Sequence, residues 1–144
     1  MRKKVLCFVA ATILLFTAIP SVFADTPQYY HAGYTTPVRH YFTTGNSLTK
    51  GSSWHSIEDY CIETIFVNSS DTPYHKTLLF DENGTQIGTE ELTVYNSQTE
   101  GFNNSTIASA QAYAKVKFRI YNPNYVSGGS NFPKMKTKGY MLST

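Results

Sequence analysis

Residues 57–68 read IEDYCIETIFVN and carry the clearest strand signal in the chain. Polar and apolar residues alternate there, and β-branched and aromatic side chains are frequent, as is typical of a strand with one buried face. One face of this strand holds four residues that we expect in the core: Tyr60, Ile62, Thr64 and Phe66. The other face, which we expect to meet solvent, holds Asp59, Cys61 and Glu63.

The next strands along the chain are marked by a turn. Residues 76–81 read as a strand, and residues 81–84, with the sequence DENG, read as a hairpin turn because Asn and Gly tolerate positive φ. The return strand is expected over residues 85–89. This hairpin is similar to those of many bacterial immunoglobulin-like modules, a resemblance that implies a β-sandwich.

Residues 107–121 alternate over a longer distance. Alanines followed by Val116, Phe118 and Ile120 lie on one face at a period of two. Helix propensity alone allows a helix over residues 108–114. The sustained period of two favours a strand or a bent strand instead, and residues 134–142 read as the last strand.

Turn-forming residues recur about every ten residues, and no segment has a convincing amphipathic helix pattern. This spacing predicts an all-β fold, a single antiparallel β-sandwich that is immunoglobulin-like or small barrel-like, over residues 25–144. That segment has the length of one domain and can bury a core of its own. Cys61 is its only cysteine, so we expect no intramolecular disulfide.

Residues 1–24 have the three parts of a secretory signal peptide. Residues 2–4 are cationic, residues 5–19 form an apolar run, and small residues precede Asp25. The run is shorter than the ~20 residues that a membrane-spanning helix needs. We therefore expect cleavage before Asp25 rather than a membrane anchor.

The expected destination is the outside of a bacterial cell. A small exported domain without a disulfide suggests a bacterium, and we expect a Gram-positive one that uses the general secretory route. Residues 134–144 contain neither a sortase motif nor an apolar tail. We expect a released protein with no transmembrane segment in its mature chain.

The charges are segregated along the sequence. The whole chain has 12 basic and 10 acidic residues, but the signal peptide removes three bases, so the mature chain has a net charge of −1 and no nucleic-acid partner is expected. Residues 25–100 contain all ten acids and three bases, whereas residues 101–144 contain six bases and no acid. Two strands carry those six bases at a period of two, each followed by a tyrosine: Lys115, Lys117, Arg119 and Tyr121, and Lys134, Lys136, Lys138 and Tyr140.

These eight residues are the predicted ligand-binding residues. If the two strands are neighbours, their cations repel one another and a bound polyanion would offset the repulsion. The candidate partners are cell-wall polyanions such as teichoic acids, anionic lipid head groups, and a protein. An alternative is that lysines protect exposed strand edges, or that acids on flanking strands neutralise the cations: Asp59, Glu63, Glu90 or Glu91.

No catalytic or metal-binding pattern emerges from the sequence. The spacing of the histidines is not that of metal ligands on a strand or a helix, and the serines lack the motifs of serine hydrolases. A pair of Cys61 with His55 or His40 is disfavoured, because Asp59 and Glu63 on the expected face of the thiol discourage a thiolate. We expect no cofactor, no metal and no enzyme activity; a small hydrolase that uses His55 ranks last.

Two functions remain from different classes. The first is a secreted, non-catalytic binding protein that docks on the cell envelope or on other polyanionic surfaces through a basic strand face. The alternative is a secreted antimicrobial or toxin-like protein that acts on the membranes of rival cells.

Overall fold

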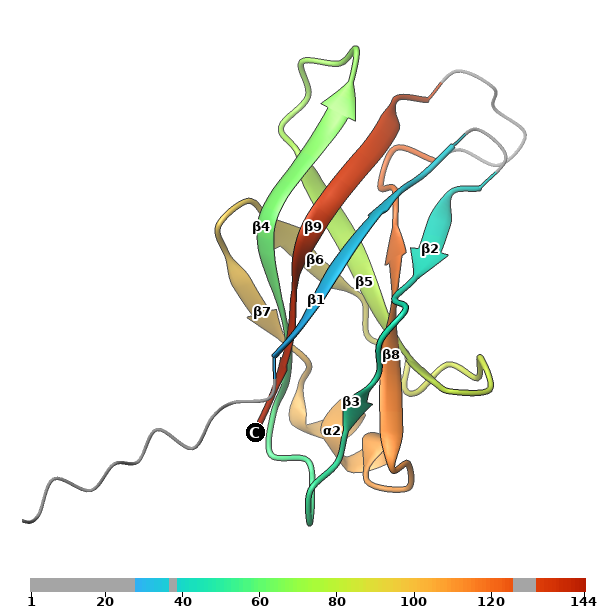
Figure 1. Ribbon diagram of the computed structural model, residues 1–144, viewed down its shortest axis with the longest axis vertical. Coiled ribbons are helices and arrows are strands. Elements are labelled where there is room, and N and C mark those ends of the chain that lie inside the picture. The colour runs from blue at the N-terminus through green and yellow to red at the C-terminus, as the bar shows by residue number, and fades with distance from the viewer. Residues whose placement is uncertain (1–27, 37–38, 126–131) are drawn as a thin grey trace, which may run out of the picture.

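The computed structural model describes residues 28–36, 39–125 and 132–144, and the predicted signal peptide lies outside them. The described chain forms two antiparallel sheets that pack against each other, so the prediction of an all-β sandwich is confirmed. Figure 1 shows the two layers, with β1, β9 and β4 in one and β2, β8 and β5 in the other. Within the described residues, no helix is both long enough and apolar enough to cross a membrane.

The first layer, here called sheet A, has the strand order β1-β9-β4-β7. Its strands are β1 (Gln28–Tyr34), β9 (Lys134–Ser143), β4 (Ile57–Val67) and β7 (Thr99–Gly101). The last strand of the chain is inserted between β1 and β4 and pairs with both. Three segments far apart in the sequence therefore lie side by side in sheet A, with β1 at its edge.

The second layer, sheet B, has the order β2-β8-β5-β6, with β3 also paired to β8. Its strands are β2 (Tyr41–Thr43), β3 (Leu48–Thr49), β5 (Tyr74–Asp81), β6 (Leu92–Tyr95) and β8 (Lys115–Tyr121). Apolar side chains from the two sheets fill the space between them. Fully buried members of this core include Leu48, Ile57, Leu79, Val94, Phe118 and Met135.

Part of the segment predicted as one long strand is a helix. Helix α2 spans Asn104–Ala110, and of residues 107–121 only Lys115–Tyr121 is a strand. Asn103 caps the helix by accepting a hydrogen bond from the backbone N–H of Thr106. The strand prediction was wrong here because alanine at alternate positions fits a short helix equally well.

The hairpin turn forms as predicted, but its return strand does not. The Asp81 carboxylate accepts hydrogen bonds from the backbone N–H groups of Asn83 and Thr85, and Gly84 has a φ of 84°. Beyond the turn the pairing is reduced to a single bridge between Phe80 and Gln86. Residues 85–89 are therefore a short connection rather than a strand.

A β-bulge in β4 changes which side chains face the core. Cys61 pairs with Gly139 and Glu63 pairs with Lys138, so Ile62 is an extra residue without a partner on β9. The buried residues of β4 are Ile57, Asp59, Cys61, Thr64 and Phe66. The expectation that Asp59 and Cys61 meet solvent was wrong, since neither has exposed surface. The expectation that Tyr60 and Ile62 are core residues was also wrong, since both are only half-buried.

The side chain of Asn96 hydrogen-bonds the β4 backbone two residues after the bulge, beyond the end of the pairing with β7. Its Oδ1 accepts from the backbone N–H of Thr64 at 2.6 Å, and its Nδ2 donates to the Thr64 carbonyl at 3.1 Å. Beside it, the Cys61 backbone exchanges hydrogen bonds with Ser97 and Gln98. A side chain therefore takes the place of a missing strand partner and holds the register of β4.

Replacing Asn96 by alanine should destabilise the fold. Asn96→Ala leaves the backbone N–H and C=O of Thr64 without these partners, and we expect a loss of about 1–3 kcal/mol in the free energy of unfolding, measured by urea denaturation. Gln98→Ala is the control, because this side chain is exposed, and it should change stability by less than about 0.5 kcal/mol. Equal stability of the two variants would show that the hydrogen bonds of Asn96 to Thr64 do not stabilise the fold.

Candidate functional site

The two predicted basic strands lie in different sheets. β8 belongs to sheet B and β9 belongs to sheet A, so they are not neighbours and their cations do not share one surface. Within each strand the period-two pattern holds, because the residues between the cations are buried. The cross-strand repulsion on which the prediction of one polyanion site rested is absent, and each basic face has to be judged separately.

On β8, other side chains of the protein already contact most of the cationic groups. The Lys115 ammonium lies 3.5 Å from a Glu82 carboxylate oxygen. The Arg119 guanidinium lies over the rings of Tyr41 and Phe80, at 4.7 and 3.8 Å from their centroids. Tyr121 packs against Tyr41, with ring centroids 5.2 Å apart. These contacts stabilise the fold and leave little of the positive charge on this face available to a ligand.

The outer face of β9 keeps more of its charge free. The Lys138 ammonium forms an ion pair of 3.0 Å with Glu63 on β4, as the neutralising alternative anticipated. Within the described part of the chain, Lys134 and Lys136 form no ion pair. Lys136 pairs with Tyr34 of β1 on one side and with Ile65 of β4 on the other. The uncompensated charge of sheet A thus lies beside an aromatic and an aliphatic side chain.

The other acids weighed as neutralising partners have different roles. Glu91 pairs with Lys76 of β5, which is not one of the predicted site residues. Glu90 accepts a hydrogen bond from the backbone N–H of Asn103, next to helix α2. Asp59 is buried inside the sandwich and cannot reach the outer face of either sheet.

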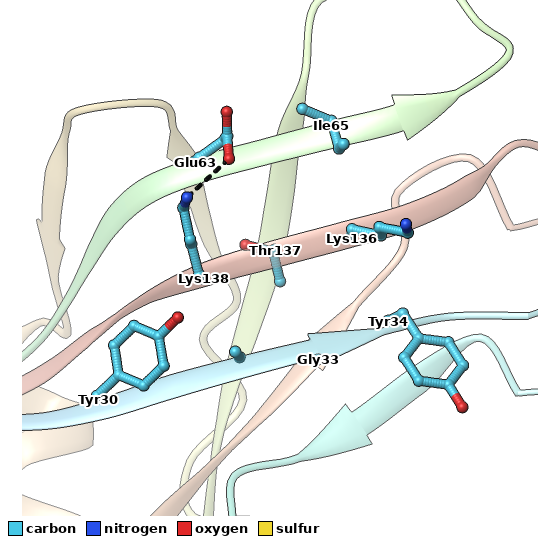
Figure 2. A pocket seen from close by; sticks show the side chains of 9 residues that line it. Tyr30, Gly33, Tyr34, Glu63, Ile65, Lys136, Thr137 and Lys138 are labelled. Atoms are coloured by element: carbon cyan, nitrogen blue, oxygen red, sulfur yellow. Dashed lines mark ion pairs between the residues drawn. The ribbon is translucent and has the colours of Figure 1, made fainter.

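A hollow of about 420 Å³ opens on this face of sheet A (Figure 2). On β1, Tyr30 and Tyr34 stand at either side of Ala32, whose small side chain leaves the space between them. Figure 2 shows the two tyrosines along β1, with Lys136 and Lys138 on the middle strand and Glu63 and Ile65 on the far strand.

Several large side chains around the hollow are exposed. Tyr30 is 49% exposed, Tyr34 65% and Ile65 42%. The Tyr30 ring is braced edge-on by Tyr140, with centroids 5.7 Å apart. Sequence reasoning named Lys136, Lys138 and Tyr140 but missed the residues from β1 and β4. The alternation of Tyr30, Ala32 and Tyr34 was a usable signal, because it puts two tyrosines and a small residue on one face.

A buried polar cluster lies directly beneath the hollow, on the inner side of sheet A. Its members alternate along the strands with the residues of the hollow. His31 follows Tyr30 on β1, Thr64 follows Glu63 on β4, and Thr137 lies between the two lysines of β9. All three of these inner residues are buried. The same three strands therefore shape the hollow outside and the cluster inside.

Asp59 is the centre of this cluster. Its two carboxylate oxygens lie 3.0 Å from Nε2 of His31 and 2.9 Å from Nε2 of His75, and it also accepts a hydrogen bond from the Thr77 hydroxyl. The other ring nitrogen of His75, Nδ1, lies 2.9 Å from the Thr64 hydroxyl. Because Asp59 and Thr64 belong to sheet A and His75 and Thr77 to sheet B, the cluster joins the two layers.

The electrostatics of the cluster favour a buried ion pair. Burial raises the pKa of Asp59, but the hydrogen bonds from His31 and His75 outweigh this effect and hold the pKa well below its usual range. Burial lowers the pKa of His75, but the hydrogen bond to Asp59 outweighs it and raises the pKa to about 9. At neutral pH a carboxylate and an imidazolium therefore face each other inside the core.

One glycine makes room for this arrangement. A Cβ on Gly139 would overlap the carbonyl oxygen of Tyr60 and would come within 2.9 Å of Nε2 of His31. Glycine at this point of β9 therefore lets the His31 imidazole reach Asp59. Sequence spacing did not reveal the cluster, since its acid and its two histidines come from three different strands.

The cluster is structural rather than catalytic. Asp59, His75 and Thr77 have no exposed surface, so no substrate reaches them. In the parts of the chain that are described, no group of three or more His, Cys, Asp or Glu side chains is arranged to hold a metal ion. The chemistry open to ligands is that of the hollow: aromatic faces, one free ammonium group from Lys136 and the paired carboxylate of Glu63.

Comparison with known proteins assigns no family. No protein-family model matches the chain, and no curated protein or solved structure matches it either.

Stability should fall as the pH rises from about 6.5 to about 9. The pKa of His75 is raised to about 9 in the folded protein. The contribution of His75 to the free energy of unfolding is therefore complete below its unfolded pKa of about 6.5, and it is lost as the pH rises through its folded pKa. At about 1.4 kcal/mol per pKa unit, the loss is on the order of 3 kcal/mol in unfolding free energy, measured by urea denaturation at stepped pH. Asp59 acts in the opposite direction, and its contribution is lost only as the pH falls below about 4.

A histidine outside the cluster provides the control for this measurement. His55 is exposed, so His55→Gln should keep the decline between pH 6.5 and 9. His75→Gln should remove most of it. A wild-type stability that stays constant over that range would contradict a buried imidazolium at position 75.

Proposed function

We propose that the protein is a secreted, non-catalytic binding protein of a bacterium that attaches to polyanionic polymers of the cell envelope through the outer face of sheet A. The observation that carries the proposal is the pair Lys134 and Lys136. Within the described chain neither forms an ion pair. Lys136 lines the hollow with its exposed tyrosines, and Lys134 lies two residues before it on the same face of β9.

The arrangement of these charges favours a polymer over a small ion. Two lysines at alternate positions of one strand project their ammonium groups to the same side, about 7 Å apart along the strand. Each exposed ammonium attracts an anion weakly, because water and salt screen the interaction. A polymer with repeated negative groups can contact both ammonium groups at once, and this multivalency gives a higher affinity than a single weak contact.

The hollow is better suited to binding than to catalysis. Its one carboxylate, Glu63, is already in an ion pair with Lys138. The Asp59 and His75 pair, which has the groups of an acid–base catalyst, is sealed beneath the sheet. General acid–base chemistry needs such a group within hydrogen-bond reach of the reacting atom.

Export is part of the proposal and has its own test. The signal-peptide pattern of residues 1–24 predicts that expression of the full chain in a Gram-positive host releases a protein beginning at Asp25. N-terminal sequencing of the protein recovered from the medium checks this. Recovery of the uncleaved chain in the membrane fraction would contradict it.

Charge reversal on the two sheets separates the two basic faces. We expect the secreted protein to sediment with purified Gram-positive cell walls at about 0.01 M salt and to be released at about 1 M, where the Debye length falls from about 30 to about 3 Å. The double variant Lys134→Glu, Lys136→Glu should lose most of this retention. The matched variant Lys115→Glu, Lys117→Glu reverses two charges on sheet B and should keep it.

The same assay can overturn the proposal. Equal retention of the sheet A variant and the wild type would show that this face is not the binding surface. Retention on anionic liposomes without retention on cell walls, together with inhibition of growth of related bacteria, would favour the membrane-acting alternative.

A further inference from the structure

We infer that the hollow on sheet A binds an acidic glycan, meaning a hydroxyl-rich chain of sugar rings that carries spaced anionic groups. This inference rests on the proposed function and names the class of polymer. It is argued from the aromatic side chains, the size of the hollow and the order of charges around it.

The first observation is the position of the tyrosine rings. Tyr30 and Tyr34 project from the same face of β1 and remain 49% and 65% exposed. Tyr30 is held edge-on against Tyr140, which fixes its orientation and leaves half of it open to solvent. An aromatic ring with an open face offers a flat apolar surface and a polar rim, and the C–H face of a sugar ring can stack on such a surface. Exposed rings in fixed positions beside a hollow are typical of a binding surface.

The second observation is size. The hollow of about 420 Å³ lies within the range of ligand-binding clefts, about 300–1,000 Å³. Its two tyrosines are four residues apart on one strand, which is about 13 Å along β1. The small side chain of Ala32 between them leaves the middle of the hollow open. The span accommodates linked rings better than a single small ion.

The third observation is the order of the charges. Lys136, which forms no ion pair within the described chain, supplies a positive group for a carboxylate or phosphate. Glu63 places a carboxylate in the same hollow, held by Lys138 at 3.0 Å. A polymer with closely spaced phosphates gains no favourable contact from the Glu63 carboxylate, whereas sugar hydroxyls can donate hydrogen bonds to it. The hollow thus matches a ligand with many hydroxyls and isolated negative groups.

The strands beneath the hollow are fixed before any ligand arrives. The inner neighbours of the hollow residues, His31, Thr64 and Thr137, are tied into the buried cluster around Asp59. A preorganised surface loses little conformational freedom on binding, and this lowers the cost of forming the complex.

The test compares polymers that share charge but differ in sugar content. Binding of the secreted protein to polygalacturonate, to inorganic polyphosphate and to neutral dextran is measured by calorimetry at low salt. Tyr34→Ala should weaken binding of polygalacturonate about fivefold, the loss of one aromatic stacking contact, and Tyr34→Trp should restore it. Tyr95→Ala is the matched control, since Tyr95 is 40% exposed on sheet B.

The outcomes separate the two proposals. Tighter binding of polygalacturonate than of polyphosphate, with the Tyr34→Ala effect confined to the former, supports the inference. If both polyanions bind equally and Tyr34→Ala changes neither, the glycan assignment is overturned while polyanion binding stands. Binding to anionic phosphatidylglycerol vesicles alone also overturns it. If neither polyanion nor cell walls are bound at low salt, the proposed function fails as well.

Discussion

Asp59 places a negative charge at the centre of the sandwich, where water cannot solvate it. An isolated carboxylate in that position would be very costly, so the fold has to bring partners to it from several strands. His31 comes from β1, whereas His75 and Thr77 come from β5 in the other sheet. The contact therefore constrains both the register within sheet A and the alignment of sheet A with sheet B.

This constraint also determines what sheet A presents to solvent. In a strand, neighbouring side chains point to opposite faces, so fixing the inner residues fixes the outer ones. With Thr64 held inward by His75, Glu63 and Ile65 have to face outward. The bulge at Ile62 is what makes this compatible with Asp59 and Cys61 facing inward earlier in the same strand. The buried polar cluster and the exposed hollow are therefore formed by alternate residues of the same strands, on opposite faces of sheet A.

Local pattern was sufficient for the fold class and for the outward orientation of the lysines of β9, because both depend on a simple alternation. It failed where a single residue changes the phase. The extra Ile62 reverses the inner and outer faces of β4. Asn96, whose side chain bonds the backbone of Thr64 just after the bulge, lies 32 residues beyond Thr64 in the sequence. The pairing of strands could not be predicted from the sequence pattern either, because β8 and β9 have the same pattern yet belong to different sheets. The tyrosines and the glutamate of the hollow meet the lysines only through that pairing.

For an exported protein, which is what we propose this chain to be, the position of Cys61 has a consequence in an oxidising medium. It is a free cysteine with no exposed surface, packed 3.3 Å from the Thr64 hydroxyl. In an oxidising medium an accessible thiol is converted to sulfenic acid or joins two molecules through a disulfide. Here the sulfur lies on the inner face of sheet A and is shielded only once sheet B packs against that face, so it is open to oxidation only before folding is complete. If the protein is exported as proposed, the speed of folding after export decides whether Cys61 forms an intermolecular disulfide.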